Sequence, residues 1–208
     1  MTRGYGGYNS DHARHMVNQI IESENSGPGK VLISTIFFGS NDASNGIQNV
    51  PIERYAGNIK YVAETLLQQG IKVLIIGTAL HDEVENPDPA HDTRSVDDNL
   101  AYSRAARKVA TELNVGFVDL FQTMLDSVGW KQGDPMPGKK GSGSTVSLKH
   151  LLPDGLHFSG KGYQVFYKAV KAEIKRKYPE LDSDNLPQLL PPWDQIGEDI
   201  DKSLYGDK

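Results

Sequence analysis

A carboxylate and an imidazole lie three residues apart in the stretch DGLHFSGKGY, just before a predicted helix. They belong to Asp154 and His157. A carboxylate that holds one nitrogen of an imidazole leaves the other nitrogen available as a general base, provided that a nucleophile lies within reach. The spacing predicts a hydrogen bond between an Asp154 carboxylate oxygen and His157 Nδ1. Taken alone, the pair fits a structural contact within a loop more readily than a catalytic one.

A candidate hydrogen-bond donor for a reacting carbonyl group follows an apolar run in the stretch FFGSNDAS. The side-chain N–H of Asn41 can donate to a bound carbonyl oxygen, as an oxyanion donor must. The alternative is a turn at Asn41 and Asp42 that caps the next segment. The stretch RGYGGYNS is open to the same two interpretations, because Gly4, Gly6 and Gly7 suit either a close backbone approach to a ligand or a simple turn.

Three apolar runs are predicted to form the strands that position these residues. They span residues 30–39, 72–79 and 116–120 and are rich in β-branched and aromatic residues. Such runs are typical of strands that are buried on both faces of a parallel sheet. Because sites in parallel α/β sheets lie at the carboxyl ends of the strands, we expect the candidate groups to gather there.

Apolar residues recur at helical spacing between and after these runs. The first predicted helix ends at Gly70, and its apolar face comprises Tyr55, Ile59, Val62 and Leu66. The second has a face of Leu100, Ala105, Val109 and Leu113. The last helix follows an N-cap at Ser159, and its face comprises Tyr163, Phe166, Val170 and Ile174. Strands that alternate with helices favour right-handed crossovers, so the predicted fold class is α/β, with three layers around a mostly parallel sheet.

The length and composition indicate one domain. A chain of 208 residues with 38% hydrophobic residues can bury a sizeable core. We assign residues 1–180 to this domain and residues 181–208 to a carboxyl-terminal extension that is rich in proline and acidic residues. The extension is expected to pack on the surface through Leu189, Leu190 and Trp193 and then to fray.

The charge and the cysteine content exclude several function classes. The net charge is −5, and the 22 basic residues are scattered, so no binding to nucleic acid or to an anionic membrane surface is expected. The absence of cysteine excludes disulfides, thiol nucleophiles and thiolate metal sites. No apolar run approaches the ~20 residues of a membrane span, and the first residues lack the apolar core of a signal peptide. A cytoplasmic location, a small-molecule substrate and no cofactor are therefore expected.

Four histidines offer an alternative metal-hydrolase site, with His81, His91, His150 and His157 as ligands. No pair of them has the spacing that places two ligands on one helix face, and most lie in predicted loops. His81 and His91 are interpreted instead as solvated residues of the loop at residues 81–98. This loop and the one at residues 131–147 either rim a pocket or form mobile surface.

The order of three motifs adds to these separate signals. A Gly-rich turn comes first, Gly-x-Asn-Asp follows a strand, and Asp-x-x-His precedes the terminal helix. In this order the chain resembles the SGNH hydrolases, also called GDSL-type esterases and lipases. The resemblance covers most of the chain and is closest to the isoamyl acetate-hydrolysing esterase branch. RGYGGYNS is similar to the second block of that branch, TIFFGSNDAS to the third and LLPDGLHFSGKGYQVFY to the fifth, and the late PPW segment is also similar.

The resemblance implies a role for each candidate residue. The backbone N–H of Gly7 and the side-chain N–H of Asn41 would hold the oxyanion. His157 would be the general base, and Asp154 would orient it. Asp42 would tie down the loop. The implied fold is the three-layer, flavodoxin-like sheet of the SGNH hydrolases, and the implied substrates are short-chain acyl esters such as isoamyl acetate.

The chain departs from the family pattern at its beginning. The first block of the family, a strand followed by Gly-Asp-Ser with the nucleophilic serine, lies upstream of the second block, and here only Met1 and Thr2 precede Arg3. Ser26, Ser40 and Ser159 are not convincing replacements, so the nucleophile is expected to lie outside this sequence. In the family the first strand pairs with residues 31–38, which would become an apolar sheet edge without it.

Two explanations follow for this departure. The sequence is either an amino-terminally truncated form, which we favour, or another segment covers the edge. The 208-residue chain is expected to be nearly inactive, because a triad without its nucleophile retains little catalysis. A rival interpretation is a non-catalytic binding or regulatory protein of the same fold, which pairs its exposed edge with another chain, including a second copy of itself.

Overall fold

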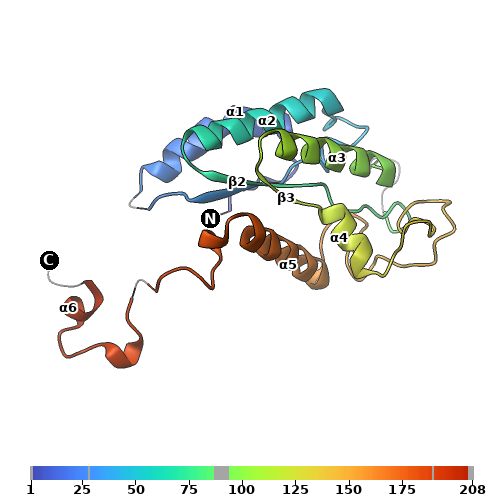
Figure 1. The fold of residues 1–208 in the computed structure, drawn as a ribbon. Coiled ribbons are helices and arrows are strands. Elements are labelled where there is room, and N and C mark those ends of the chain that lie inside the picture. Colours follow the sequence, from blue (N-terminus) through green and yellow to red (C-terminus); the bar gives the residue numbers. More distant parts are fainter. Residues whose placement is uncertain (1, 28, 87–93, 189, 206–208) are drawn as a thin grey trace.

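The computed structural model describes residues 2–27, 29–86, 94–188 and 190–205. A parallel sheet lies between two layers of helices (Figure 1). Its strands are β1 (Ile33–Ile36), β2 (Lys72–Ile76) and β3 (Gly116–Val118), in the order β1-β2-β3. Both pairings are parallel, with Ile33 opposite Lys72 and Leu74 opposite Gly116. The carboxyl ends of the strands therefore lie together at one end of the sheet, as the sequence predicts.

The helices divide between the two faces of the sheet (Figure 1). One apolar core lies beneath α1 (Ser10–Asn25), α2 (Ile52–Gln68) and α3 (Val96–Glu112). The second core lies beneath α4 (Leu120–Ser127) and α5 (Gly160–Lys177). The predicted α/β fold with three layers is therefore confirmed.

The predicted apolar faces account for much of both cores. All four residues of the first face are buried, namely Tyr55, Ile59, Val62 and Leu66. Gly70 adopts a φ of 72°, the left-handed conformation that commonly follows a helix end. Ser159 caps α5, because its side chain accepts hydrogen bonds from two backbone N–H groups of the first turn. Phe166, Val170 and Ile174 pack against the second core.

Tyr163 corrects the predicted face of α5. Its side chain is 60% exposed, although its position continues the spacing of Phe166, Val170 and Ile174. The ring lies at the rim of the core, edge-on to Phe158 at a centroid distance of 5.4 Å. Helical spacing indicates which residues share a face but not where the neighbouring layer stops covering that face.

β1 forms an edge of the sheet in the described part of the chain. Its one strand partner is β2, and Leu32, which directly precedes β1, is 51% exposed. The expected apolar edge is therefore present. The strand itself is shorter than the apolar run at residues 30–39 at both ends, and Gly39, three residues after its last residue, has a φ of 128°.

Two of the helices that pack against the sheet, α1 and α4, were not predicted from the sequence. α1 buries Ala13, Val17 and Ile21, which recur every four residues, and Asn9 caps it by accepting a hydrogen bond from His12 N. These two signals together could have identified α1. α4 begins inside the run at residues 116–120 that was predicted as a strand, because Asp119 acts as its N-cap.

The described residues of the carboxyl-terminal extension form two short elements, η2 (Trp193–Gln195) and α6 (Ile200–Tyr205), and η1 (Pro179–Leu181) lies across its start. Figure 1 shows that it leads away from the sheet. The expected packing of Leu190 and Trp193 is wrong, since they are 52% and 86% exposed, and Leu189 lies outside the described residues. Prolines at 187, 191 and 192 lack the N–H groups that would tie this segment to a surface. The division into residues 1–180 and 181–208 stays a prediction.

In the ranges that the structure describes, none of the helices is both long enough and apolar enough to cross a bilayer.

Candidate active site

Asp154 and His157 face each other on the loop before α5. His157 Nδ1 lies 2.7 Å from Asp154 Oδ2, as the spacing predicts. Asp154 Oδ1 also accepts the backbone N–H groups of His157 at 2.7 Å and Leu156 at 3.0 Å. The His157 side chain is 79% exposed. Because Nδ1 is held by the carboxylate, Nε2 is the ring nitrogen that can accept a proton from a reacting group.

The contacts of Asp154 determine its charge. Partial desolvation raises the pKa of this carboxyl group, but hydrogen bonds from the ring and backbone of His157 and from the backbone of Leu156 outweigh it. The pKa is lowered to about 2. Asp154 is therefore an anion at neutral pH, and its carboxylate can orient the ring of His157.

A neighbouring loop holds this turn in place. The backbone N–H of Asp82 donates to Gly155 O at 2.9 Å. Gly155 has a φ of 82°, and an added Cβ would lie 2.4 Å from Asp82 O, so only glycine fits. Asp82 is 3% exposed, and its Oδ1 accepts the N–H groups of Val84 and Glu85. The turn is thus hydrogen-bonded to a buried part of the loop that follows β2.

The interpretation of His81 as a solvated residue is wrong. His81 is 0% exposed, because the chain around it packs beneath other loops. Glu83 N donates to Gly138 O at 2.8 Å, and Lys140 N donates to Glu83 Oε2 at 3.0 Å. The described parts of the loops at residues 81–98 and 131–147 therefore contact each other. His91 lies outside the described residues.

Asn41 lies beside Gly7 and Tyr8 after the end of β1. Its Nδ2 donates to Tyr8 O at 2.7 Å, while Gln48 Nε2 donates to Gly7 O at 2.8 Å. Gly7 has a φ of 79°. The structure thus brings the loop that carries Asn41 to the segment of Gly7 and Tyr8, although the two are far apart in the sequence.

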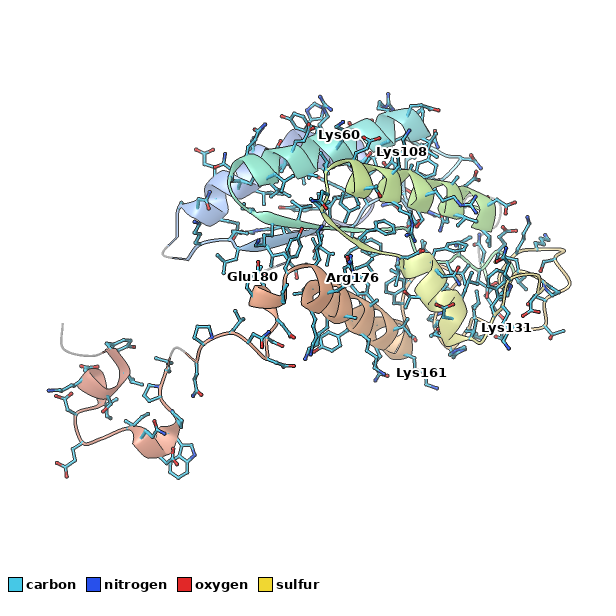
Figure 2. The ribbon with its side chains drawn as sticks, in the orientation of Figure 1. Lys60, Lys108, Lys131, Lys161, Arg176 and Glu180 are labelled. Atoms are coloured by element: carbon cyan, nitrogen blue, oxygen red, sulfur yellow. The ribbon has the colours of Figure 1, made fainter. Side chains whose placement is uncertain are left out.

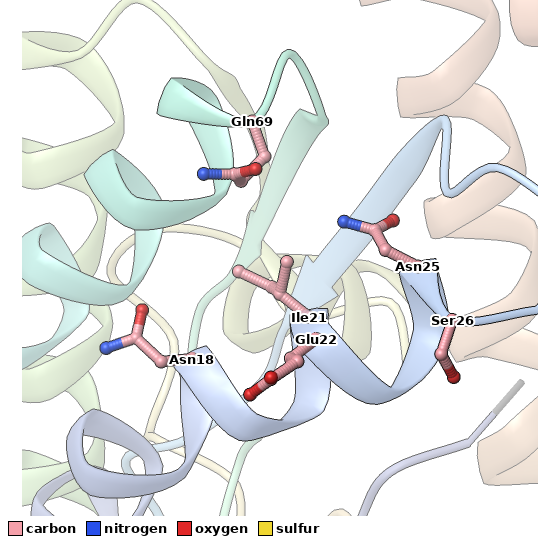
Figure 3. A pocket seen from close by; sticks show the side chains of 6 residues that line it. All are labelled: Asn18, Ile21, Glu22, Asn25, Ser26 and Gln69. Carbon is pink, nitrogen blue, oxygen red and sulfur yellow. The ribbon is translucent and has the colours of Figure 1, made fainter.

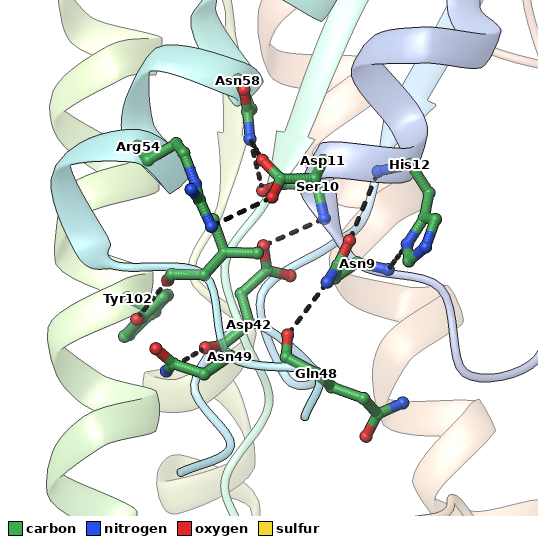
Figure 4. Close-up of polar contacts among 11 residues, drawn as sticks. Asn9, Ser10, Asp11, His12, Asp42, Gln48, Asn49, Arg54, Asn58 and Tyr102 are labelled. Atoms are coloured by element: carbon green, nitrogen blue, oxygen red, sulfur yellow. Dashed lines mark hydrogen bonds and ion pairs between the residues drawn. The ribbon is translucent and has the colours of Figure 1, made fainter. Parts of the chain in front are cut away.

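Asp42 ties this loop to α1 (Figure 4). Its Oδ1 accepts the N–H of Ser10 at 2.9 Å, and Asp42 O accepts Asn49 Nδ2 at 2.9 Å. The residue is fully buried, and its Oδ2 accepts no hydrogen bond from the residues that the structure describes. Burial raises the pKa of this carboxyl group despite the hydrogen bonds from Ser10. Asp42 therefore anchors the loop, and it does so by a buried carboxyl rather than by a group open to substrate.

Aromatic packing links the Asp154–His157 loop to the end of β1. Phe158, directly after His157, stacks on Phe37 at a centroid distance of 6.4 Å, and Phe37 lies four residues before Asn41. α5 begins at the end of the sheet where the strands end (Figure 1), and Lys161 in its first turn lies at that end in Figure 2. The two pairs of predicted residues therefore occupy the same end of the sheet.

A hollow of about 520 Å³ lies elsewhere (Figure 3). It is lined by Asn18, Ile21, Glu22, Asn25, Ser26 and Gln69. Gln69 precedes β2, so this hollow lies near the amino ends of the strands, away from Asn41. It contains none of the predicted site residues. A shared cleft around Gly7, Asn41 and His157 stays a prediction.

Among the contacts of the described residues, none joins Ser26, Ser40 or Ser159 to the side chain of His157. The partner of the His157 side chain within the described ranges is Asp154. Ser26 Oγ donates to Ser23 O, and Ser159 Oγ donates to His150 O. Nor do the described residues hold a group of three or more His, Cys, Asp or Glu side chains that could bind a metal ion.

Sequence reasoning missed Arg94 and Gln48. Arg94 Nη2 donates to Asn41 Oδ1 at 2.9 Å and to Gln48 Oε1 at 3.1 Å. No local motif marks either residue, because their partners are distant in the chain.

Comparisons with known proteins agree with this arrangement. Residues 1–165 match the model of the GDSL-like Lipase/Acylhydrolase family. The isoamyl acetate-hydrolyzing esterase of Saccharomyces cerevisiae is 31% identical, and the match covers 96% of this chain and 78% of the yeast protein. The isoamyl acetate-hydrolyzing esterase 1 homolog of Homo sapiens is 27% identical, over 100% of this chain and 79% of the human protein.

Solved structures share the fold. The lipase/acylhydrolase of Enterococcus faecalis superposes with a TM-score of 0.59 at 20% identity, over 82% of this chain and 72% of that chain. The acetylxylan esterase Axe2 of Geobacillus stearothermophilus superposes with a TM-score of 0.63 at 16% identity, over 84% and 71%. At these identities the likeness shows the fold, and it confirms the predicted SGNH hydrolase architecture.

Proposed function

This chain belongs to the GDSL-like lipase/acylhydrolase family, whose members are hydrolases acting on esters, and from that premise we propose that it carries the acid–base and oxyanion parts of a serine esterase site. The observation that carries the proposal is the 2.7 Å contact between His157 Nδ1 and Asp154 Oδ2, with Nε2 left for proton transfer. The proposed substrates are short-chain acyl esters such as isoamyl acetate, the substrate named for the yeast relative.

The proposed mechanism assigns a step to each of these groups. A serine hydroxyl attacks the ester carbonyl, and His157 Nε2 accepts the hydroxyl proton. The Asp154 carboxylate stabilises the resulting imidazolium. The tetrahedral oxyanion accepts hydrogen bonds from the Gly7 N–H and from Asn41 Nδ2. His157 then returns the proton to the departing alcohol, and water releases the acyl group by the same steps in reverse.

The nucleophilic serine is proposed to lie in a segment outside these 208 residues. Two features support this placement. The side chain of His157 is 79% exposed, and its Nδ1 contacts the Asp154 carboxylate, so Nε2 can be reached from outside. In the described part of the chain β1 is an edge strand that pairs with β2 alone. An added strand that paired with this edge and ended near His157 would cover the edge and also bring a hydroxyl to Nε2.

A chimera tests the proposal. The 208-residue chain is expected to hydrolyse a chromogenic acetate ester negligibly, since loss of the nucleophile costs about a million-fold in related chemistry. An added amino-terminal strand that ends in Gly-Asp-Ser should restore turnover of this ester and of isoamyl acetate. Replacing the added serine by alanine, or His157→Ala, should abolish the gain. Turnover by the unextended chain that survives purification and His157→Ala would contradict the assignment.

The uncovered β1 edge also supports a second candidate, a binding role in which another chain pairs with this edge. Leu32 at the start of the edge is 51% exposed, as a pairing surface requires. Sedimentation of the 208-residue chain separates the candidates. A dimer that Leu32→Lys dissociates favours the binding role, whereas a monomer that becomes an esterase on extension favours the enzyme.

A further inference from the structure

Arg94 lies two residues before α3 and contacts the loop that carries Asn41. Its Nε donates to Ser40 O at 2.6 Å, and its Nη2 donates to Asn41 Oδ1 at 2.9 Å and to Gln48 Oε1 at 3.1 Å. A planar guanidinium holds its donors in a fixed fork, so it constrains the direction of each acceptor more strongly than an ammonium does. A single side chain therefore donates three hydrogen bonds to this loop.

The two carboxamides that contact Arg94 are oriented in the same way. Each directs its oxygen to the guanidinium and its nitrogen to a backbone carbonyl. Asn41 Nδ2 donates to Tyr8 O at 2.7 Å, and Gln48 Nε2 donates to Gly7 O at 2.8 Å. A carboxamide that rotates by half a turn would exchange its oxygen and its NH₂ group, but arginine offers only donors. Arg94 thus selects the orientation in which both NH₂ groups face residues 7 and 8.

This orientation matters for an oxyanion donor. Asn41 Nδ2 carries two hydrogens, and the bond to Tyr8 O uses one, so one hydrogen remains for a ligand. A cationic donor on Oδ1 polarises the amide and strengthens the hydrogen bond that Nδ2 makes. We propose that Arg94 is a positioning residue for the oxyanion site, which fixes Asn41 directly and fixes Gly7 through Gln48. The catalytic consequence rests on the proposed function, whereas the positioning is a property of this chain alone.

The positioning is testable in the 208-residue protein by ¹⁵N NMR of the Asn41 side-chain NH₂ group. Arg94→Ala removes the charge-assisted hydrogen bond to Asn41 Oδ1, so the amide can rotate and its NH₂ group is no longer held against Tyr8 O. Hydrogen exchange of this NH₂ group is therefore expected to become roughly 10-fold faster or more. Arg94→Lys should give an intermediate rate. Guanidinium at about 20 mM, far below the molar concentrations that unfold proteins, should slow exchange again in Arg94→Ala.

The matched control is Arg104→Ala, on the exposed side of α3, which should leave the Asn41 signals unchanged. A purely structural role for Arg94 would give no response to guanidinium at Asn41. Unchanged Asn41 exchange in both Arg94 variants, with urea unfolding confirming that at least one of them is folded, would overturn the inference.

The catalytic consequence is measured in the extended, active chain. There Arg94→Ala should lower kcat about 10- to 100-fold, somewhat less than the loss of a whole oxyanion donor, with KM changed by less than about twofold. Guanidinium should recover part of kcat. An unchanged kcat would overturn the catalytic role of the positioning. If the extended parent itself is inactive, the proposed function is contradicted, while the NMR result still decides whether Arg94 positions Asn41.

Discussion

Replacing Gly155 by alanine tests how the Asp154–His157 turn is held. Gly155 has a φ of 82°, and an added Cβ would lie 2.4 Å from Asp82 O and 3.3 Å from Asn86 N. The left-handed backbone costs a residue with a side chain about 1–2 kcal/mol. Displacing packed backbone adds about 1–3 kcal/mol, as overpacking does in cores. We therefore expect Gly155→Ala to lower the free energy of unfolding by about 2–5 kcal/mol.

Gly141 provides the matched control. Its φ is 76°, nearly that of Gly155, but nothing lies within 4 Å of an added Cβ. Gly141→Ala should therefore cost the backbone contribution alone, about 1–2 kcal/mol. Urea unfolding at neutral pH measures both variants, and the excess loss in Gly155→Ala reports the contact with Asp82. Equal losses would refute the argument that the neighbouring loop holds the turn.

Two further predictions concern pH. The pKa of Asp154 is lowered from 3.8 to about 2 in the folded protein, so its contribution to stability is complete above about pH 4 and is lost as the pH falls toward 2. Asp154→Asn should abolish this dependence. The difference between the urea midpoints of the parent protein and Asp154→Asn should therefore shrink as the pH falls from about 4 to about 2, and a difference that stays constant would contradict the assignment. The pKa of Asp42 is raised from 3.8, so the stability linked to its protonated form is present below about pH 4 and is lost as the pH rises through the folded pKa. Asp42→Asn should therefore gain stability relative to the parent protein between pH 4 and pH 7, and parallel pH profiles would show that the carboxyl is not desolvated.

The parts of the site that sequence reasoning predicted are those set by short spacing. Asp154 and His157 are three residues apart, so a tight turn is enough to bring the two side chains together, and the contact with Asp82 then holds the turn in place. Ser159 precedes α5, and capping depends only on the next few N–H groups. The burial of the α2 face follows in the same way from the helical period. In each case the physical cause acts within a few residues, and the sequence displays it directly.

His81 shows why local reasoning fails elsewhere. It lies in an acidic stretch with two prolines, a composition typical of solvated loops, yet it is fully buried. Burial arises because the loop after it is fastened to two distant loops, through Glu83 N to Gly138 O and through Asp82 N to Gly155 O. Composition reports the average preference of a segment for water. It does not report how many other segments pack against that segment in the folded protein.

The orientation of Asn41 extends this argument to function. The stretch FFGSNDAS places an amide after a strand, but the torsion that decides whether its nitrogen or its oxygen faces a ligand depends on distant partners. Tyr8 O lies 33 positions before Asn41, and Arg94 lies 53 positions after it. By the inference above, replacing Arg94 would leave every residue of the motif in place and still free the amide to turn. An oxyanion donor of this kind is therefore specified by the tertiary contacts around the motif, and Arg94 is the residue through which such a change would act most directly.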